Sequence, residues 1–363
     1  MKARSTFAAL LAVLTATPGR PCAPAPPPGV TVSILTEQAL IVWDPATRRQ
    51  HFIRRASFES AAADFGFLVP TPTPPELAEA PDSVFDRLHE AIQPEVVHLT
   101  GLRPVPSALV FLPFIFLSRS APEGAGIPVA APAGPSFAAP PVRVLEEKRV
   151  AGYEAAVLQA DDAPALLGWL KAHHYDARPE LLEWLRAYVD QHWTITAFKV
   201  ARGSGAERVA TQAVRMSFTT ERPFFPYREP ADQRRGHFGA RRLGVYLVAP
   251  GRMVGTIGPS RDWPADVPWA APNAALDTVV TPVLPAGSTL PAGAWLNAFV
   301  DTASPRPGVD DLFFALARTQ QTVKPPPIIV DERTDLPIPL DLAVGLLGGA
   351  WWWRRRRARA ARA

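Results

Sequence analysis

Residues 30–58 read VTVSILTEQALIVWDPATRRQHFIRRASF, and this stretch decides the fold class. Its first part, 30–43, is rich in β-branched and apolar residues, which favour a strand. Asp44-Pro45 is a turn signal, and 51–58 has the pattern of a returning strand. A strand, a short turn and a second strand pair in antiparallel fashion, so the body is predicted to begin with an antiparallel hairpin.

The same kind of segment recurs along the chain. Further strands are predicted at 65–70, 108–117, 142–145, 153–158, 193–200, 209–218, 243–249 and 295–300. The Pro/Gly-rich region 258–294 is predicted to be irregular. Strands outnumber helices and do not alternate with them, which predicts an α+β fold with mostly antiparallel sheet.

Three main helices are predicted. The first begins after Asp82, a good N-cap residue, and ends before Pro94. The second begins near Asp162. The third covers 178–190, where apolar residues recur at helical spacing, and the face with Leu185 is predicted to be core.

Composition divides the chain into seven segments. These are a signal peptide (1–22), an N-terminal subdomain (30–120), an Ala/Pro/Gly-rich linker (121–141), a C-terminal subdomain (142–318), a tether (319–339), a transmembrane anchor (340–353) and a basic cytoplasmic tail (354–363). A segment of this Ala/Pro/Gly composition buries too little apolar area to offset the entropy cost of ordering, so the linker is predicted to be disordered. The two subdomains are expected to meet across it.

Both ends of the chain carry targeting signals. Basic Lys2 and Arg4 precede the uncharged run 5–16, which is typical of a secretory signal peptide. Near the other end, the uncharged segment 342–353 finishes in three tryptophans and is followed by four arginines. Aromatic residues next to a cationic cluster are typical of the cytoplasmic end of a membrane span, so a C-terminal transmembrane helix is predicted.

Charge and cysteine content exclude several classes of protein. The chain has a net charge of +4, but six arginines lie in the last ten residues, which leaves −2 for residues 1–353. A mildly acidic body argues against nucleic-acid binding. Cys22 is the single cysteine, which excludes an intramolecular disulfide, a zinc site built on cysteines and an iron–sulfur cluster.

The order of several motifs resembles a bacterial family catalogued as domain of unknown function 2330. The motifs that carry the likeness are ALIVWD (39–44), DFGFLVPTP (64–72), PDSVFDRL (81–88), YEAAVL (153–158), APALLGWL (163–170), WTITAFKV (193–200), QAVRMSF (212–218) and FPYR (225–228). The resemblance covers about residues 30–320 and extends to both targeting ends. Family members often begin the mature chain with several cysteines, whereas this chain has only Cys22. The resemblance implies location and architecture but no activity.

No catalytic, cofactor-binding or metal-binding residue is assigned, and no cofactor is expected. The phosphate loop, the dinucleotide fingerprint and the common hydrolase motifs are absent. His173, His174, Asp176 and His192 lie close together in the sequence and could supply metal ligands, but adjacent histidines on a helix point about 100° apart. They are interpreted as residues at helix C-termini, where the dipole favours them.

Three other groups of residues have structural interpretations. The basic stretch from Arg234 to Arg242 is read as a solvated loop that is also suited to an anionic partner. Paired carboxylates such as Asp310-Asp311 are read as solvated turns or caps. Trp169, Trp184 and Trp193 resemble a sugar-stacking platform but are expected to be core residues.

Two functions of different classes remain open. The favoured one is a non-enzymatic extracytoplasmic envelope protein, a binding or structural module that is anchored to the cytoplasmic membrane by its C-terminal helix. Its expected partners are the membrane and another envelope protein, and nucleic acid is not among them. The alternative is an envelope hydrolase or metal-dependent enzyme whose site assembles from scattered residues, with His173, His174 and His192 as first candidates.

Overall fold

The computed structural model describes residues 24–25, 32–60, 64–107, 142–175, 178–201, 208–210, 212–235, 242–339, 349–355 and 357. Contacts divide the chain into two units. The larger unit comprises residues 1–93 and 129–325, and the smaller one comprises residues 94–128 and 326–363. The predicted linker 121–141 and the predicted strand 108–117 lie outside the described residues.

The predicted hairpin is the centre of the largest sheet. Strand β2 (Val32–Asp44) pairs with β3 (Arg49–Ser60), and the Asp44 carboxylate closes the turn by accepting hydrogen bonds from Ala46 N (2.9 Å) and Thr47 Oγ1 (2.7 Å). The eight-stranded sheet has the order β17-β18-β14-β2-β3-β12-β5, and β11 also pairs with β3. The remaining strands of this sheet are β5 (Glu76–Ala80), β11 (Arg208–Ala210), β12 (Ala213–Thr219), β14 (Arg242–Ala249), β17 (Asp266–Pro272) and β18 (Trp295–Asp301).

Two further sheets belong to the larger unit. The five-stranded sheet has the order β1 (Pro24–Ala25), β4 (Asp64–Thr71), β10 (Thr194–Ala201), β9 (Tyr153–Ala160) and β8 (Val142–Val150). The four-stranded sheet has the order β13 (Phe224–Phe225), β19 (Leu312–Leu316), β15 (Met253–Ile257) and β16 (Arg261–Asp262). In the larger unit, the pairing of β14 with β2 is parallel and the other strand pairs are antiparallel.

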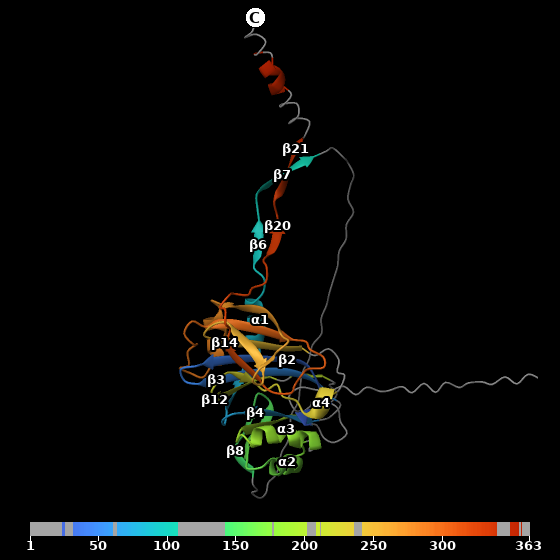
Figure 1. The fold of residues 1–363 in the computed structure, drawn as a ribbon, viewed down its shortest axis with the longest axis vertical. Coiled ribbons are helices and arrows are strands. Elements are labelled where there is room, and N and C mark those ends of the chain that lie inside the picture. The colour runs from blue at the N-terminus through green and yellow to red at the C-terminus, as the bar shows by residue number, and fades with distance from the viewer. Residues whose placement is uncertain are drawn as a thin grey trace, which may run out of the picture. The chain divides into compact units, whose positions relative to one another are not determined.

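Short helices cover the outer faces of two sheets. Helices α2 (Ala163–Ala172) and α3 (Pro179–Val189) pack on the five-stranded sheet. On the eight-stranded sheet, α1 (Ser83–Ala91), α5 (Leu276–Val279) and the 3₁₀ turn η1 (Thr281–Val283) cover the face that points away from the five-stranded sheet (Figure 1). The eight-stranded and five-stranded sheets therefore lie between two helical layers.

Side chains alternate between the two faces of each strand, so successive residues belong to different hydrophobic cores. In β9, Tyr153 and Val157 face the central core between the sheets, whereas Ala156 and Leu158 face α2 and α3. In β2, Ile41 faces the central core and its neighbours on the chain face α1 and α5. Strands buried on both faces have near-continuous apolar sequences, as residues 39–43 (ALIVW) of β2 do.

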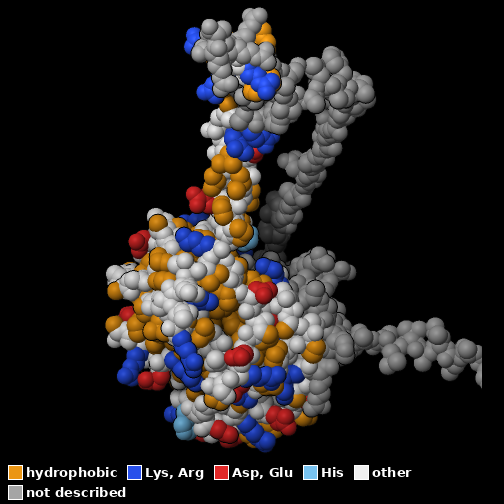
Figure 2. Space-filling view, turned by 45° about the horizontal axis from the view of Figure 1, so that its top comes forward, with side chains coloured by type: hydrophobic (Ala, Val, Ile, Leu, Met, Phe, Trp, Pro, Cys, Tyr) orange, Lys and Arg blue, Asp and Glu red, His pale blue; other side chains and the backbone are white. Residues whose placement is uncertain are grey.

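The smaller unit contains two parallel two-stranded ribbons. Strand β6 (Val96–Leu99) pairs with β20 (Ile328–Asp331), and β7 (Leu102–Ser107) pairs with β21 (Thr334–Pro339). Hydrophobic side chains gather on the surface of this unit (Figure 2), among them the exposed Val96, Leu102, Ile328 and Ile329.

The predicted α+β fold with mostly antiparallel sheet is confirmed, and its helices are short. Strands from both predicted subdomains, 30–120 and 142–318, lie next to one another in the eight-stranded sheet. The units defined by contacts are a separate division of the chain, and the boundaries of the two subdomains stay a prediction. Within the predicted tether 319–339, residues 328–331 and 334–339 are strands.

The membrane-related predictions fall mainly outside the described residues. These predictions are the signal peptide (1–22) and the transmembrane anchor, of which 340–348 are not described. Residues 349–355 are helical, and their three tryptophans are exposed. Within the described residues, no helix combines the length and the apolar composition that a membrane crossing requires.

Candidate functional site

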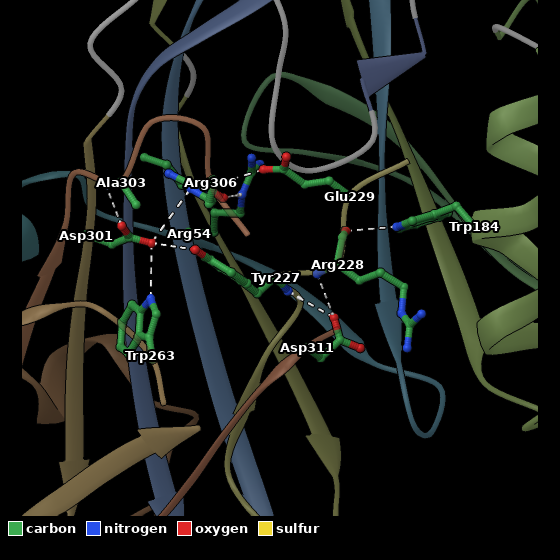
Figure 3. Close-up of polar contacts among 11 residues, drawn as sticks. Arg54, Trp184, Tyr227, Arg228, Glu229, Trp263, Asp301, Ala303, Arg306 and Asp311 are labelled. Carbon is green, nitrogen blue, oxygen red and sulfur yellow. Dashed lines mark hydrogen bonds and ion pairs between the residues drawn. The ribbon is translucent and has the colours of Figure 1, made fainter. Parts of the chain in front are cut away.

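A network of buried charges crosses the central core of the larger unit (Figure 3). It contains three carboxylates, Glu37, Glu229 and Asp301, and two guanidiniums, Arg54 and Arg306. Each of these side chains is at most 2% exposed. Charged groups pay a large desolvation cost in such a place and persist only where they are paired and hydrogen-bonded.

The alternation of side chains along a strand explains why two of these charged residues point into the core. Glu37 shares the odd-numbered face of β2 with Ile41, which belongs to the central core. Arg54 shares the face of β3 that carries Phe52, and its guanidinium lies 4.7 Å from the centre of the Phe67 ring. Arg54 Nε donates to Glu37 Oε1 at 2.7 Å.

Arg306 connects the strands to the segment that carries Glu229. Its Nη1 lies 3.9 Å from Glu37 Oε2 and 3.9 Å from Glu229 Oε1, and its Nε lies 3.8 Å from Asp301 Oδ2. The Glu229 backbone is fixed as well, because its N–H donates to Gly308 O at 2.9 Å. One guanidinium therefore faces three carboxylates from three separate parts of the chain.

Asp301, at the end of β18, accepts three hydrogen bonds. Tyr227 OH and Trp263 Nε1 donate to its Oδ2 at 2.7 and 3.0 Å, and Ala303 N donates to its Oδ1 at 2.8 Å (Figure 3). Burial and the Asp301 charge raise the pKa of Tyr227 far above its usual value. Tyr227 therefore keeps its proton and remains a hydrogen-bond donor.

Asp311 organises the neighbouring segment. Its Oδ1 accepts from Tyr227 N (2.9 Å), Arg228 N (3.1 Å) and Tyr188 OH (3.0 Å). Burial raises the pKa of Asp311 to about 6, against the effect of these donors. The interpretation of Asp310-Asp311 as a solvated pair is wrong for Asp311, which is 3% exposed because the 227–228 backbone folds over it.

A small polar cavity lies beside this network, between α3 and α4 (Ala231–Arg235). Its volume is about 160 Å³. Its charged lining consists of Glu180, Glu183, Arg228, Glu229 and Arg234. Trp184 closes one side and donates from Nε1 to Arg228 O at 2.9 Å (Figure 3). Arg234, which lines the cavity, is the first residue of the predicted basic loop. Residues 236–241 of that loop lie outside the described residues.

The three histidines considered as metal ligands, His173, His174 and His192, lie on the surface at helix ends. His173 stacks on Trp169, with ring centres 3.7 Å apart, and its Nδ1 is 2.8 Å from Trp169 O. His174 and His192 adopt left-handed backbone conformations, with φ of 63° and 60°. Asp176 is not described, and among the described residues no group of His, Cys, Asp and Glu side chains could hold a metal ion.

His174 and His192 each end a helix with the same motif. After His174, Tyr175 N donates to Leu170 O at 2.9 Å, and after His192, Trp193 N donates to Tyr188 O at 3.0 Å. These bonds define a Schellman motif, in which glycine usually occupies the left-handed position. The aromatic residue that follows each histidine packs against the core under the helix. Their role in the structure is helix termination.

Replacing His174 or His192 by glycine is therefore expected to leave the free energy of unfolding unchanged or to raise it by up to about 1 kcal/mol, because glycine removes the left-handed strain. Lys171→Gly, in the last turn of α2, is the control and should lower it by about 1 kcal/mol. Urea denaturation measures all three. A loss of several kcal/mol on either histidine replacement would show that the side chain itself is needed.

One serine–histidine pair occurs in the eight-stranded sheet. His51 Nδ1 lies 2.8 Å from Ser217 Oγ, but Ser217 is only 1% exposed, so a substrate carbonyl has no path to this hydroxyl. Burial, together with the charges of Arg49 and Arg215, lowers the pKa of His51 from 6.5 to about 4.

The His51 pKa predicts a pH-dependent stability difference. The folded state resists protonation of His51, so the unfolded state binds more protons between pH 4 and 6.5, and stability rises with pH in that window. The difference in unfolding free energy between the natural chain and His51→Asn should therefore grow with pH, by up to about 3 kcal/mol. Denaturation curves between pH 4 and 7 test this, and a constant difference would contradict it.

The Trp169 and Trp184 side chains are buried, as predicted, and Trp193 is half-buried against the core. The network residues were not predicted as a site. The available signal was a charged residue, Glu37 or Arg54, at a core-facing position of an otherwise apolar strand.

Comparisons with known proteins give one family and one distant structural similarity. The sequence model of the family described as "Uncharacterized protein conserved in bacteria (DUF2330)" matches residues 21–255. No curated protein matches the chain. Among solved structures, a mutated baculovirus P35 after caspase cleavage is similar at 8% identity and a TM-score of 0.31, covering 82% of this chain and 100% of that one. That similarity is too weak to bear on fold or function.

Proposed function

The chain belongs to the bacterial DUF2330 family, and we propose that it is an extracytoplasmic envelope protein with a binding or structural role, held at the cytoplasmic membrane by its C-terminal end. In this proposal the signal peptide 1–22 exports the chain, the body remains outside the cytoplasm, and the basic tail 354–363 stays inside. The envelope location also sets its expected partners, the membrane and another envelope protein.

One observation carries the proposal. The helical residues 349–355 present three consecutive tryptophans that are 53–57% exposed. The guanidiniums of Arg355 and Arg357 lie over the rings of Trp351 and Trp353, each 3.9 Å from the ring centre. Tryptophan rings favour the headgroup level of a bilayer, and arginines next to a span favour the cytoplasmic side.

Segment length sets how such an end can sit in a bilayer. The uncharged residues 342–353 would cover about 18 Å as a helix, whereas the hydrocarbon core is about 30 Å thick. A short segment is accommodated by local thinning and by long side chains such as Arg354 that extend to the headgroups. Asp341, the charged residue that directly precedes the segment, would lie at its outer edge, where water solvates it.

Fractionation of an epitope-tagged protein tests the proposal. The full-length chain should pellet with membranes and stay there in high salt, and protease added outside the cytoplasmic membrane should cut its body. Deletion of residues 340–363 should release the body in soluble form outside the cytoplasm. A soluble full-length chain, or a body that protease reaches only after the cytoplasmic membrane is lysed, would overturn the proposal.

Matched replacements separate membrane insertion from loss of folding. Changing Trp351, Trp352 and Trp353 to leucine keeps the segment apolar and should preserve membrane association. Changing Val344, Leu346 and Leu347, near the middle of the segment, to aspartate should release the protein, because each aspartate at the centre of a span costs about 2.5–3.5 kcal/mol. Equal fractionation of the leucine and aspartate variants would count against an inserted segment.

A further inference from the structure

Two arginines that line the cavity between α3 and α4 each have an unused hydrogen-bond donor. Arg228 Nη2 donates to Asp310 Oδ1 at 2.7 Å, but its buried Nε has no acceptor among the described residues. The buried Nε of Arg234 likewise has no acceptor there. Buried donors are rarely left without acceptors, and both of these belong to arginines that line the cavity.

The chemistry of these donors selects the acceptor. A guanidinium is planar, permanently charged and suited to a carboxylate or another oxyanion. Arg228 is positioned by the backbone bonds that Asp311 and Trp184 make to it, so its guanidinium is held at the cavity wall. Arg234 enters the same cavity from α4.

The opposite wall has the opposite charge. Glu180 and Glu183 lie three residues apart on α3, which places them on one side of the helix, and both line the cavity. No ion pair joins either carboxylate to another described residue. Carboxylates in this position favour an ammonium group. Glu229 also lines the cavity, but its carboxylate faces Arg306 Nη1 at 3.9 Å in the buried network and is not assigned to the ligand.

Size limits the ligand further. A volume of about 160 Å³ is close to that of a cavity that holds one benzene molecule. From the volume, the two guanidiniums and the two glutamates, we infer that the cavity binds a small zwitterion with the carboxylate and ammonium groups of an α-amino acid. The carboxylate lies toward Arg228 and Arg234, and the ammonium lies toward Glu180 and Glu183.

This inference names a ligand class for the binding role proposed above, but it does not depend on the membrane anchor. Binding is measured on the purified full-length chain, whereas the anchor is tested by fractionation. If the full-length protein is soluble and binds the zwitterion, the membrane-anchor proposal is wrong and the binding site is supported. If the protein is membrane-bound and does not bind the zwitterion, the binding-site inference is wrong and the anchor proposal is supported.

Titration calorimetry with glycine and L-alanine tests the site, with acetate and methylammonium as ligands that carry one charge each. We expect saturable glycine binding that weakens at least tenfold in Arg234→Gln and in Glu183→Gln. Arg186→Gln, on an exposed position of α3 that does not line the cavity, should leave binding unchanged. Acetate binding should depend on Arg234 and not on Glu183, and methylammonium binding should show the reverse.

Other outcomes overturn the inference. Absence of saturable binding of glycine or L-alanine up to 100 mM would show that the cavity is a structural gap. Acetate that binds as well as glycine, with no effect of Glu183→Gln, would replace the zwitterion by a simple anion. Unfolding curves of each variant accompany the titrations. Glu183 is exposed and Arg234 is half-buried, so their replacements should unfold nearly like the natural chain.

Discussion

Replacing Asp301 by alanine is expected to lower the free energy of unfolding by about 3–5 kcal/mol. The side chain is fully buried, and its removal leaves Tyr227 OH, Trp263 Nε1 and Ala303 N without their acceptor. It also takes one of the three carboxylates away from the buried guanidinium of Arg306. An uncompensated buried charge and unpaired donors are the costly consequences of breaking such a network.

Asp86→Ala is the matched control for Asp301→Ala. Asp86 forms an ion pair with Arg55 at 3.2 Å, but its side chain is 72% exposed, so its loss should cost less than about 1 kcal/mol. Urea denaturation followed by tryptophan fluorescence measures both variants. If Asp301→Ala costs no more than Asp86→Ala, the network does not stabilise the fold as the geometry implies.

The network also has a consequence for the cavity. Arg306 and Asp301 hold Tyr227 and Glu229 on one side, and Asp311 holds the backbone of 227–228 on the other. These contacts fix the segment that carries Arg228 into the cavity wall. Buried ion pairs contribute little net stability compared with apolar packing, so we attribute their presence to positioning of this segment.

Local patterns in the sequence predicted the central elements of the fold. The hairpin of β2 and β3 follows from two apolar segments on either side of Asp44-Pro45. Helix α3 follows from the spacing of Leu181, Leu185 and Tyr188, all of which are buried. In each case the signal lies within a few residues, and the partner of each strand is close in the chain.

Elements that depend on distant partners were not predicted. Residues 258–294 were expected to be irregular, yet β17 pairs with β18, and α5 covers the eight-stranded sheet. These elements are short, and proline and glycine obscure their patterns. The parallel pairing of β14 with β2 joins residues about two hundred positions apart, and no local pattern specifies such a pair.

The candidate site was beyond sequence reasoning for a related reason. Adjacent carboxylates such as Asp310 and Asp311 look alike in the sequence, but only Asp311 is turned inward, where the backbone of 227–228 supplies its donors. Glu229 and Arg306 are joined by tertiary contacts between two irregular segments. The histidines gave the stronger sequence signal, because imidazoles suggest metal binding, yet they end helices.

Replacing Leu185 by alanine is expected to lower the free energy of unfolding by about 2–5 kcal/mol. Its side chain is fully buried in the core between α3 and the five-stranded sheet, so truncation leaves a cavity that the neighbouring side chains fill only in part. Glu183→Ala, on the exposed face of the same helix, should change stability by less than about 0.5 kcal/mol. The same denaturation assay compares the two variants, and equal small effects would mean that α3 does not pack through this face. A large loss for Leu185→Ala alone would locate the stabilising contact of α3 under the cavity wall, since Glu183 and Trp184 line the cavity from the same turn of helix.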